Sequence, residues 1–512
     1  MTPLIEGLLK TCSVEHPDPA PELIETHISW VILSGPYAYK IKKPLKLGFL
    51  DFSSLDKRRH FCREEIRLNR RLAPEIYLGV VPISGSEAAP RFNGPGPVVE
   101  WAVQMRAFPA NATLDREAEI SREQIDAIAE SIATFHAGID AAPVGSAYGE
   151  PEAVIAPVAD NFRVLGTLCP AGDHRRQLLL ERLQAWCTAA GDALFGHFAK
   201  RKASGSIREC HGDLHLGNIA WVDSRPLIFD ALEFNPGLRQ IDLISEIAFL
   251  SMDLRHRGRH DLAWRLVDRY LELTGDIDGM AALTYYQVYR ATVRAKVAAI
   301  LADEHREEAD VHLQDSLGYL ELADQLAGEP RPALLLMHGV SGSGKTWLSQ
   351  QLLEQLGALR LRSDVTRKRL FGLKPLQESS AIPGGIYTPE TDRRTLTTLA
   401  EEAKLLLGAG FLVIVDATFL HRRWRDPFQS LAGELAVPWQ IIALEAPLEV
   451  LQARIRRRQQ SRGDASEAGL AVLAAQLKEQ DPLTAKEQAH TLHFTDAEAV
   501  ADLVNRLRAE LK

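Results

Sequence analysis

The sequence is poor in cysteine and has no long apolar run. Its 5 cysteines among 512 residues include no Cys-x-x-Cys pair, so neither a disulfide framework nor a zinc site of that type is indicated. No uncharged stretch approaches the roughly 20 apolar residues that a membrane helix needs. The first residues are acidic, whereas a secretory signal would be basic. We therefore expect a cytoplasmic protein that does not span a membrane.

The chain is too long for one ordinary core. Its 512 residues exceed the roughly 250–300 at which single domains stop growing. Hydrophobic residues make up 46% and charged residues 25% of the chain, which is typical of globular proteins. The net charge of -9 is unevenly divided, since residues 1–330 are acidic and residues 331–512 are mildly basic. Neither part is basic enough to predict nucleic-acid binding by charge alone.

A Gly/Pro-containing stretch at 326–332 predicts a linker between two domains, 1–325 and 333–512. After it, short apolar runs alternate with helical patterns, which is typical of an α/β domain with a parallel sheet. Arg360 interrupts the second of these runs. The expected strands lie at 333–337, 358–361, 411–415, 439–444 and 491–494.

Before the linker, strands come first and helices follow. Two runs at 27–33 and 37–42 flank Ser-Gly-Pro and predict a β-hairpin. A helix is expected over 55–72, with Ser53 and Asp56 spaced as a capping box. We therefore expect an α+β domain with a small β-rich lobe and a larger α-rich lobe. Its further strands are expected at 80–83 and 98–105, and its further helices at 122–136 and through most of 240–326.

Residues 339–346 read Gly-Val-Ser-Gly-Ser-Gly-Lys-Thr and fit the phosphate-loop pattern GxxxxGK[ST] between a strand and a helix. In such a loop, backbone N–H groups and the helix N-terminus surround phosphate oxygens. Lys345 is expected to reach the β- and γ-phosphates and to take part in catalysis, and the Thr346 hydroxyl is expected to bind Mg²⁺. The other phosphate-binding residues expected here are Gly339, Ser341, Gly342, Ser343 and Gly344.

Two carboxylates follow predicted strands of the same domain. Asp416 ends the strand at 411–415, and we expect it to hold the Mg²⁺ hydration shell as a Walker-B-like residue; a helix-capping Asp is the alternative. Asp364 and Arg367 lie one helical turn apart. Asp364 can accept a proton from an acceptor hydroxyl while Arg367 binds the acceptor or a phosphate. An N-cap Asp followed by a solvated Arg is the alternative to that pair.

An arginine-rich segment runs from Arg454 to Arg462. We expect it to form a mobile lid over the transferred phosphate, with Arg458 and Arg462 near the nucleotide; a solvated charged face is the alternative. The phosphate loop, the Asp364/Arg367 pair and this segment resemble the small P-loop kinases related to polynucleotide kinase, gluconate kinase and the zeta toxins. The resemblance covers 333–512 and implies phosphoryl transfer to a hydroxyl group.

A second set of polar residues lies in the first domain. Residues 209–219 read Glu-Cys-His-Gly-Asp-Leu-His-Leu-Gly-Asn-Ile and contain Asp213 and Asn218, and Asp230 follows twelve residues later. Kinase-type phosphotransferases use this order of Asp, Asn and Asp. The region 26–325 resembles the aminoglycoside phosphotransferase and choline kinase branch of the protein-kinase-like fold. This resemblance implies that Asp213 is the catalytic base and that Asn218 and Asp230 are Mg²⁺ ligands.

Upstream, Tyr37-Ala38-Tyr39-Lys40 resembles the VAIK strand of kinases, which implies that Lys40 pairs with the α- and β-phosphates. Lys42 lies on the same strand face and is the competing candidate. Helical spacing favours Glu65 over Glu64 as the partner of this lysine. Two departures argue against protein-kinase activity: the hairpin has no GxGxxG loop, and Asp-Ala-Leu at 230–232 replaces Asp-Phe-Gly.

The whole chain resembles bifunctional proteins in which an aminoglycoside-phosphotransferase-like domain precedes an ATP-binding P-loop domain. The resemblance implies ATP and Mg²⁺ as cofactors and an enzyme that phosphorylates hydroxyl groups of small-molecule acceptors at two sites. Two alternatives stay open. The first domain can be a nucleotide-binding sensor or pseudokinase that regulates the second, or the second can be a nucleic-acid end kinase. The acceptors and the oligomeric state are left open.

Overall fold

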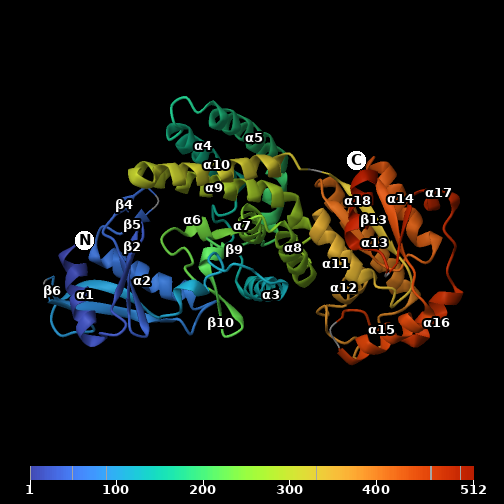
Figure 1. Ribbon diagram of the computed structural model, residues 1–512, viewed down its shortest axis with the longest axis horizontal. Coiled ribbons are helices and arrows are strands. Elements are labelled where there is room, and N and C mark those ends of the chain that lie inside the picture. Colours follow the sequence, from blue (N-terminus) through green and yellow to red (C-terminus); the bar gives the residue numbers. More distant parts are fainter. Residues whose placement is uncertain are drawn as a thin grey trace. The chain divides into compact units, whose positions relative to one another are not determined.

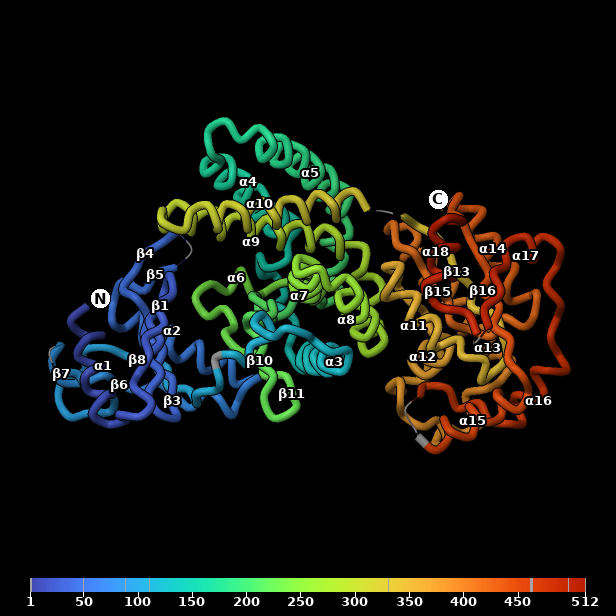
Figure 2. Tube along the Cα trace, in the orientation of Figure 1, coloured from blue at the N-terminus to red at the C-terminus, as the bar shows by residue number. Residues whose placement is uncertain are grey.

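The computed structural model describes residues 2–48, 50–87, 89–329, 331–461, 464–495 and 497–511. The path of the chain is drawn in Figure 2. The predicted linker at 326–332 includes Pro330, which lies outside the described residues. The chain divides into two compact units. Unit 1 comprises Met1–Ala127, Thr134–Val154 and Phe198–Leu250, and unit 2 comprises Ile128–Ala133, Ile155–His197 and Ser251–Lys512.

Unit 1 begins with a six-stranded antiparallel sheet in the order β1-β2-β3-β8-β6-β7. The predicted hairpin is confirmed, because β2 pairs with β3 around the turn at Gly35, which has a positive φ of 54°. The two further predicted strands are also present. The strands are β1 (Glu22–Glu25), β2 (Ser29–Ser34), β3 (Tyr37–Lys42), β6 (Tyr77–Ser86), β7 (Ala89–Phe92) and β8 (Val98–Arg106). A small hairpin of β4 (Lys46–Leu47) and β5 (Leu50–Asp51) follows β3.

Two helices cover the two faces of this sheet. Helix α1 (Pro3–Glu15) buries its apolar side in one core cluster with Tyr39 and Ile41. Because side chains alternate along a strand, Lys40 and Lys42 point to the other face. That face receives α2 (Leu55–Asn69), which packs against β6 and β8. The sheet therefore directs two lysines of β3 toward α2.

Short strands and helices complete unit 1. The ribbon β9/β12 and the ribbon β10/β11 are both antiparallel. The helix predicted at 122–136 is present as α3. The elements are α3 (Arg122–Gly138), β9 (Ile207–Glu209), η2 (Leu216–Asn218), β10 (Ile219–Val222), β11 (Arg225–Ile228), α6 (Pro236–Arg239), β12 (Gln240–Asp242) and α7 (Leu243–His256). Residues 128–133 of α3 and 251–256 of α7 belong to unit 2. Residues 26–325, in which a β-rich part is followed by a helical part, have the protein-kinase-like fold that was predicted.

Long helices fill the first part of unit 2. Two of them, α4 and α5, were not predicted from the sequence. Pro157 lies inside α4, and the apolar residues of α5 do not gather on one face, so neither shows a clear helical pattern. Helix α9 packs along α10. These helices are α4 (Pro151–Thr167), α5 (His174–Ala203), α8 (His260–Thr274), α9 (Leu283–Glu304) and α10 (Ala309–Ala327). Residues 151–154 of α4 and 198–203 of α5 belong to unit 1.

The rest of unit 2 is a P-loop fold with a five-stranded parallel sheet in the order β14-β15-β13-β16-β17, surrounded by helices (Figure 1). All five predicted strands are confirmed. They are β13 (Ala333–His338), β14 (Ala358–Arg362), β15 (Leu412–Asp416), β16 (Trp439–Leu444) and β17 (Thr491–Phe494). The helices are α11 (Lys345–Leu356), α12 (Ser363–Arg369), α13 (Pro389–Gly408), α14 (Arg422–Glu434), α15 (Leu448–Ser461), α16 (Leu470–Lys478), α17 (Ala485–Ala489) and α18 (Val500–Glu510).

Helix α8 packs directly on the P-loop fold within unit 2, where it contacts α11 and β14. Gly357 ends α11 with a positive φ of 76°. A Cβ atom at this position would lie 2.7 Å from Nε1 of Trp264 on α8. Only a glycine combines this backbone conformation with such a close approach.

None of the helices in the described ranges is both long and apolar enough to cross a membrane.

The start of α2 differs from the expectation by one residue. Ser54, not Ser53, is the N-cap, and its hydroxyl accepts a hydrogen bond from the Lys57 N–H at 3.3 Å. Ser53 instead donates from its N–H to Asp51 Oδ1 at 3.1 Å. The predicted box is therefore wrong because the preceding Asp51 already binds Ser53 and fixes it in an Asx-type turn.

We expect Ser54→Ala to lower the free energy of unfolding by about 1 kcal/mol, since it removes the partner of an otherwise unsatisfied helical N–H. Ser53→Ala, the matched control, should stay within about 0.5 kcal/mol of the parent. Urea unfolding of both variants, followed by hydrogen exchange in α2, checks this. Equal losses in the two variants would contradict the capping assignment.

Candidate active sites

The β10/β11 ribbon brings two of the predicted site residues of unit 1 to the same end. Asn218 directly precedes β10 and Asp230 follows β11, and the register pairs Ile219 with Ile228. The Phe229 N–H donates to the Asn218 carbonyl oxygen at 3.0 Å. The separation of Asn and Asp along the chain is thus the length of one hairpin.

Asp213 lies in the loop between β9 and β10, close to Asn218. The Asn218 side-chain N–H group donates to the Asp213 backbone oxygen at 2.9 Å and to its carboxylate Oδ2 at 3.2 Å. Nε2 of His215 lies 3.5 Å from the same Oδ2 atom. The structure therefore brings the predicted base and one predicted metal ligand into direct contact. It leaves the Asn218 amide oxygen as the atom available to a metal.

His211 fixes the backbone of the loop that carries Asp213. Its Nδ1 accepts from the Asp213 N–H at 3.3 Å, and its Nε2 lies 2.8 Å from the Phe229 carbonyl oxygen. These partners assign the proton to Nε2. Burial lowers the pKa of His211. We conclude that His211 is neutral. Its role is to fix the backbone of Asp213, and it is not the proton acceptor of the site.

Glu246 of α7 clamps the same loop and was missed by the sequence analysis. Its carboxylate accepts the N–H of His211 at 3.0 Å and that of Gly212 at 2.8 Å, and it also contacts His136 Nε2 at 3.2 Å. Burial opposes its charge, but His136 and the backbone donors lower the pKa of Glu246 to about 2. Asp242, the acid of the nearby Gln-Ile-Asp sequence, pairs instead with Arg201 at 2.7 Å.

Both lysines of β3 meet carboxylates. Glu65 on α2 forms ion pairs with Lys40 at 3.1 Å and with Lys42 at 2.6 Å, one through each oxygen. Lys40 also pairs with Asp230, while Lys42 pairs with Glu233, which the sequence analysis did not single out. Only Lys40 therefore reaches a predicted metal ligand, and Lys42 lies fully buried behind it.

Charge compensation favours the charged forms of Lys40 and Glu65 in this cluster. Burial alone would lower the pKa of Lys40, but Asp230 and Glu65 raise it well above its ordinary value. Burial likewise opposes the charge of Glu65, yet the two lysines hold its pKa below the usual range. Burial raises the pKa of Glu233. The Asp230 side chain is 42% exposed, so it is the member of the cluster most open to a ligand.

Asp230 has an unusual backbone conformation, with a positive φ of 65°. Its N–H donates to the Tyr77 hydroxyl at 3.1 Å, and the next N–H, of Ala231, donates to Asn69 Oδ1 at 2.8 Å. A left-handed backbone at a non-glycine residue is costly and persists only where the surroundings fix it. These two bonds fix the direction in which the carboxylate points.

In unit 2 the phosphate loop joins β13 to α11. Three of its glycines have positive φ: Gly339 at 148°, Gly342 at 85° and Gly344 at 101°. A Cβ atom would lie 2.7 Å from the Leu444 oxygen at Gly339 and 2.8 Å from the Leu451 oxygen at Gly342. The tight turn that the pattern predicted is therefore present. Ser341 uses its N–H to bind Oε1 of Gln476 at 2.7 Å.

Lys345 lies inside this loop. Its Nζ donates to the Val340 carbonyl oxygen at 2.9 Å and lies 3.5 Å from Ser343 Oγ. No carboxylate of the described residues forms an ion pair with it. Burial lowers its pKa to about 8, and the more distant Asp416 and Asp364 offset this only in part. A buried ammonium group without a paired anion fits a loop that receives a phosphate.

The carboxyl ends of β13, β14 and β15 meet at one edge of the parallel sheet, so Asp416 lies next to the loop. Asp416 is 6% exposed, and its Oδ2 accepts from Ser349 Oγ at 3.4 Å. Thr346 and Asp416 line one cavity, and their oxygen atoms are the hard ligands that Mg²⁺ prefers. Arg362, which the sequence analysis missed, also lines this cavity and has its Nε 3.7 Å from Asp416 Oδ2.

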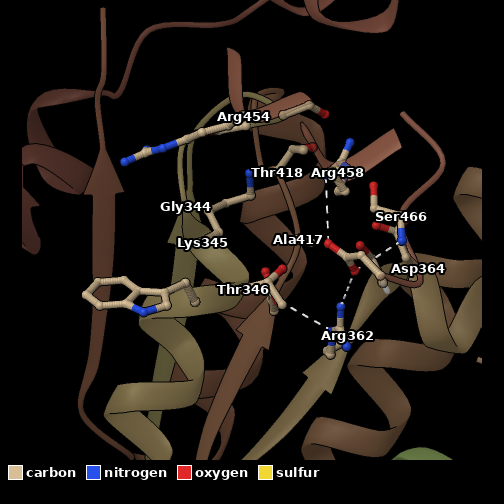
Figure 3. A pocket seen from close by; sticks show the side chains of 16 residues that line it. Gly344, Lys345, Thr346, Arg362, Asp364, Ala417, Thr418, Arg454, Arg458 and Ser466 are labelled. Carbon is tan, nitrogen blue, oxygen red and sulfur yellow. Dashed lines mark hydrogen bonds and ion pairs between the residues drawn. The ribbon is translucent and has the colours of Figure 1, made fainter. Parts of the chain in front are cut away.

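Asp364 lines the cavity on the side of Arg362 and Ser466 (Figure 3). Its predicted partner Arg367 contacts it at 3.2 Å but also pairs with Asp392 at 2.8 Å and lies over the Tyr387 ring. Arg367 is not among the residues that line the cavity. The pair therefore exists, but only Asp364 faces the phosphate loop.

The arginine-rich helix α15 covers the phosphate loop. Arg454 donates to the Ser343 carbonyl oxygen at 3.2 Å, and Arg458 donates to the Ala468 carbonyl oxygen at 2.6 Å. Both line the cavity (Figure 3), and Arg454 lies beside Gly344. Arg462 lies outside the described residues.

Comparisons with known proteins match the P-loop part of the chain and the chain as a whole. A family model described as AAA domain matches residues 334–483. The "Uncharacterized protein Rv2004c" of Mycobacterium tuberculosis (strain ATCC 25618 / H37Rv) is 31% identical over 486 residues, covering 92% of this chain and 93% of that protein. The "Uncharacterized protein Mb2027c" of Mycobacterium bovis matches to the same extent. The chain belongs to the family of these mycobacterial proteins. The match runs through both units.

Solved structures with lower identity are also similar to parts of the chain. A gluconokinase from Sinorhizobium meliloti 1021 has 20% identity and a TM-score of 0.26, and the match covers 35% of this chain and 92% of that one. Plasmodium vivax ethanolamine kinase Pv091845 has 11% identity and a TM-score of 0.35, with 59% of this chain and 81% of that one covered.

The two lysines of β3 should respond differently to removal of their charge. Lys42→Met leaves Glu233 buried without its cation, and we expect it to destabilise unit 1 by about 3–5 kcal/mol. Lys40→Met leaves Glu65 paired with Lys42 and leaves the half-exposed Asp230 in contact with water, so the loss should be smaller. Urea unfolding read by hydrogen exchange in β3 compares the two. An equal or larger loss for Lys40→Met would contradict this arrangement.

Nucleotide binding at the phosphate loop should depend on pH through Lys345. Free Lys345, with a pKa of about 8, loses its proton as the pH rises past that value. A bound phosphate raises the pKa again, so affinity should fall above pH 8 and binding at pH 9 should take up about one proton. Calorimetry in two buffers of different ionisation enthalpy measures this uptake. Lys345→Met should remove it, and the same uptake in that variant would exclude Lys345 as its source.

Proposed function

We propose that this chain is an ATP-dependent phosphotransferase with two nucleotide sites, which moves the γ-phosphoryl group of ATP to hydroxyl groups of small-molecule acceptors. One observation carries the proposal. Each unit contains its own set of a buried lysine, oxygen ligands suited to Mg²⁺ and a further carboxylate that can accept a proton. The order of a kinase-like fold before a P-loop fold supports a fusion of the aminoglycoside-phosphotransferase type.

At the site in unit 1, Asp213 would accept the proton of the acceptor hydroxyl. The hydroxyl oxygen then forms a bond to the γ-phosphorus, the bond to the β-phosphate oxygen breaks, and ADP leaves. Lys40 would neutralise the α- and β-phosphates. Asn218 and Asp230 would hold Mg²⁺, which when bound supplies charge neutralisation at the β- and γ-phosphates.

At the site in unit 2, the loop N–H groups and Lys345 would bind the phosphates, and Thr346 and Asp416 would hold Mg²⁺. Asp364 faces the same cavity and would accept the proton of a second acceptor. Arg458 would cover the transferred group and exclude water. The same proton acceptance suits the 5′-hydroxyl of a nucleic acid, so an assay with 5′-hydroxyl oligonucleotides belongs in the acceptor screen.

The test is a screen of small-molecule extracts for an ATP-dependent mass gain of one phosphoryl group, made with the full chain. We expect Asp213→Asn to lower formation of one set of products by roughly 100- to 10,000-fold, because it removes the base and keeps the shape. Lys345→Ala should abolish formation of a different set and leave the first unchanged.

Two variants serve as controls. Asp223→Asn makes the same chemical change in the turn of the β10/β11 ribbon, and Lys404→Ala removes an exposed lysine of α13. Both should keep all products. If Asp213→Asn and Lys345→Ala leave every product unchanged, the site assignments are wrong. Metal-dependent nucleotide binding in unit 1 with no product that depends on Asp213 would favour a nucleotide sensor over a second catalytic site.

A further inference from the structure

Helix α8 and strand β14 present charges at matching intervals. Arg360 and Arg362 are two residues apart on β14 and share one face, at a spacing of about 6.6 Å. Asp268 and Glu272 are four residues apart on α8 and also share one face, about 6 Å apart along the axis. The two pairs meet, with Arg360 at 2.8 Å from Asp268 and Arg362 at 3.0 Å from Glu272.

Arg360 ties α8 to the first turn of the phosphate-loop helix. Its Nη2 contacts Asp268, lies 3.1 Å from Glu272 Oε1 and donates to Gln350 Oε1 at 2.7 Å. Its Nη1 lies 3.3 Å from both the Thr346 carbonyl oxygen and Ser349 Oγ. Arg360 is 5% exposed, so these bonds replace water around the guanidinium group.

Arg362 extends the same contact into the active-site cavity. Its Nη1 donates to Glu272, and its Nη2 donates to Asp464 Oδ1 at 2.8 Å. Its Nε faces Asp416. One planar guanidinium group thus joins α8, the strand-end carboxylate and the segment that follows α15. With three carboxylates around it, the position of Arg362 depends on all three.

Glu272 is well suited to hold this arginine. Its side chain is 7% exposed, and its other oxygen pairs with Arg269 at 3.2 Å, so its carboxylate is fixed from two sides. Although burial opposes the charge, Arg362 and Arg360 lower the pKa of Glu272 to about 2, which keeps it ionised at neutral pH. Glu272 lies outside residues 334–483, which match the AAA domain model.

We propose that Glu272 is a positioning residue of the phosphate-loop site, contributed by α8. Glu272 holds Arg362 in the orientation in which Arg362 contacts Asp416 and binds Asp464. The site is therefore incomplete without this helix. The inference rests on the proposed phosphotransfer at this site.

The first test is Glu272→Gln in the full chain, with Asp213→Asn present so that the unit 1 site is silent. We expect kcat at the phosphate-loop site to fall about 3- to 30-fold. The Kd for a fluorescent ATP analogue should change little, because Lys345 and the loop N–H groups are untouched. Arg362→Lys combined with Glu272→Gln should be no slower than Arg362→Lys alone, since the two residues act as one unit.

The matched control is Glu354→Gln. Glu354 pairs with Arg265 at 2.7 Å in the same α8–α11 contact and does not line the cavity. This variant should lower the unfolding midpoint to a similar degree and keep kcat. If Glu354→Gln lowers kcat as much as Glu272→Gln, or if Glu272→Gln lowers only the midpoint, Glu272 has a structural role alone and the inference is overturned.

A second readout does not require turnover. Hydrogen exchange over 464–470 should be faster in Glu272→Gln than in Glu354→Gln, because Arg362 no longer holds Asp464 in place. If Glu272→Gln does not fold, Arg362→Lys should speed the same exchange. Equal exchange in all variants would overturn the inference. If the wild-type protein shows no turnover at this site while the variants still differ in exchange, the proposed function is overturned and the positioning role stands.

Discussion

Buried positive charge has to meet negative charge, and both candidate sites are built around that constraint. In unit 1, two lysines on one strand face are neutralised by carboxylates from α2 and from the segment after β11. In unit 2, Arg360 and Arg362 meet Asp268 and Glu272. Lys345 differs from these cations, because within the described part of the chain no carboxylate pairs with it. The phosphate loop thereby keeps a charge that an anionic ligand can neutralise.

The local parts of both sites could be predicted from the sequence. A phosphate loop needs consecutive residues, so its glycines and Lys345 stand side by side in the chain. Asp416 could be located because the end of a buried strand is visible as the end of an apolar run. Asn218 and Asp230 were grouped because their order matches that of kinase-type phosphotransferases, and the structure shows that the interval between them is the length of one hairpin. In each case the chemistry depends on neighbours along the chain or on one turn.

The residues that hold these sites in place from distant parts of the sequence could not be predicted in the same way. Glu246 binds the loop of His211 across 35 residues, and Glu272 reaches Arg362 across 90. A glutamate on a helix usually belongs to a solvated face, and nothing near it in the sequence shows that it is buried. A second carboxylate such as Glu233 could have been predicted, because two lysines on one buried strand face require more than one carboxylate. Helix α5 was missed because its apolar residues do not gather on one face, and α4 was missed because Pro157 lies inside it.

Arg360 shows how an exception to a pattern can carry information. It interrupted the apolar run at 358–361, which made that strand look weak, yet the strand is present and the arginine is buried in it. A charge cannot be buried there without a partner, so an interrupted core strand implies a carboxylate from an element that covers its face. The element is α8, which precedes the predicted linker. Composition predicts a linker at 326–332, and the ion pairs of Asp268 and Glu272 join α8, which precedes it, to the P-loop fold within the compact unit 2.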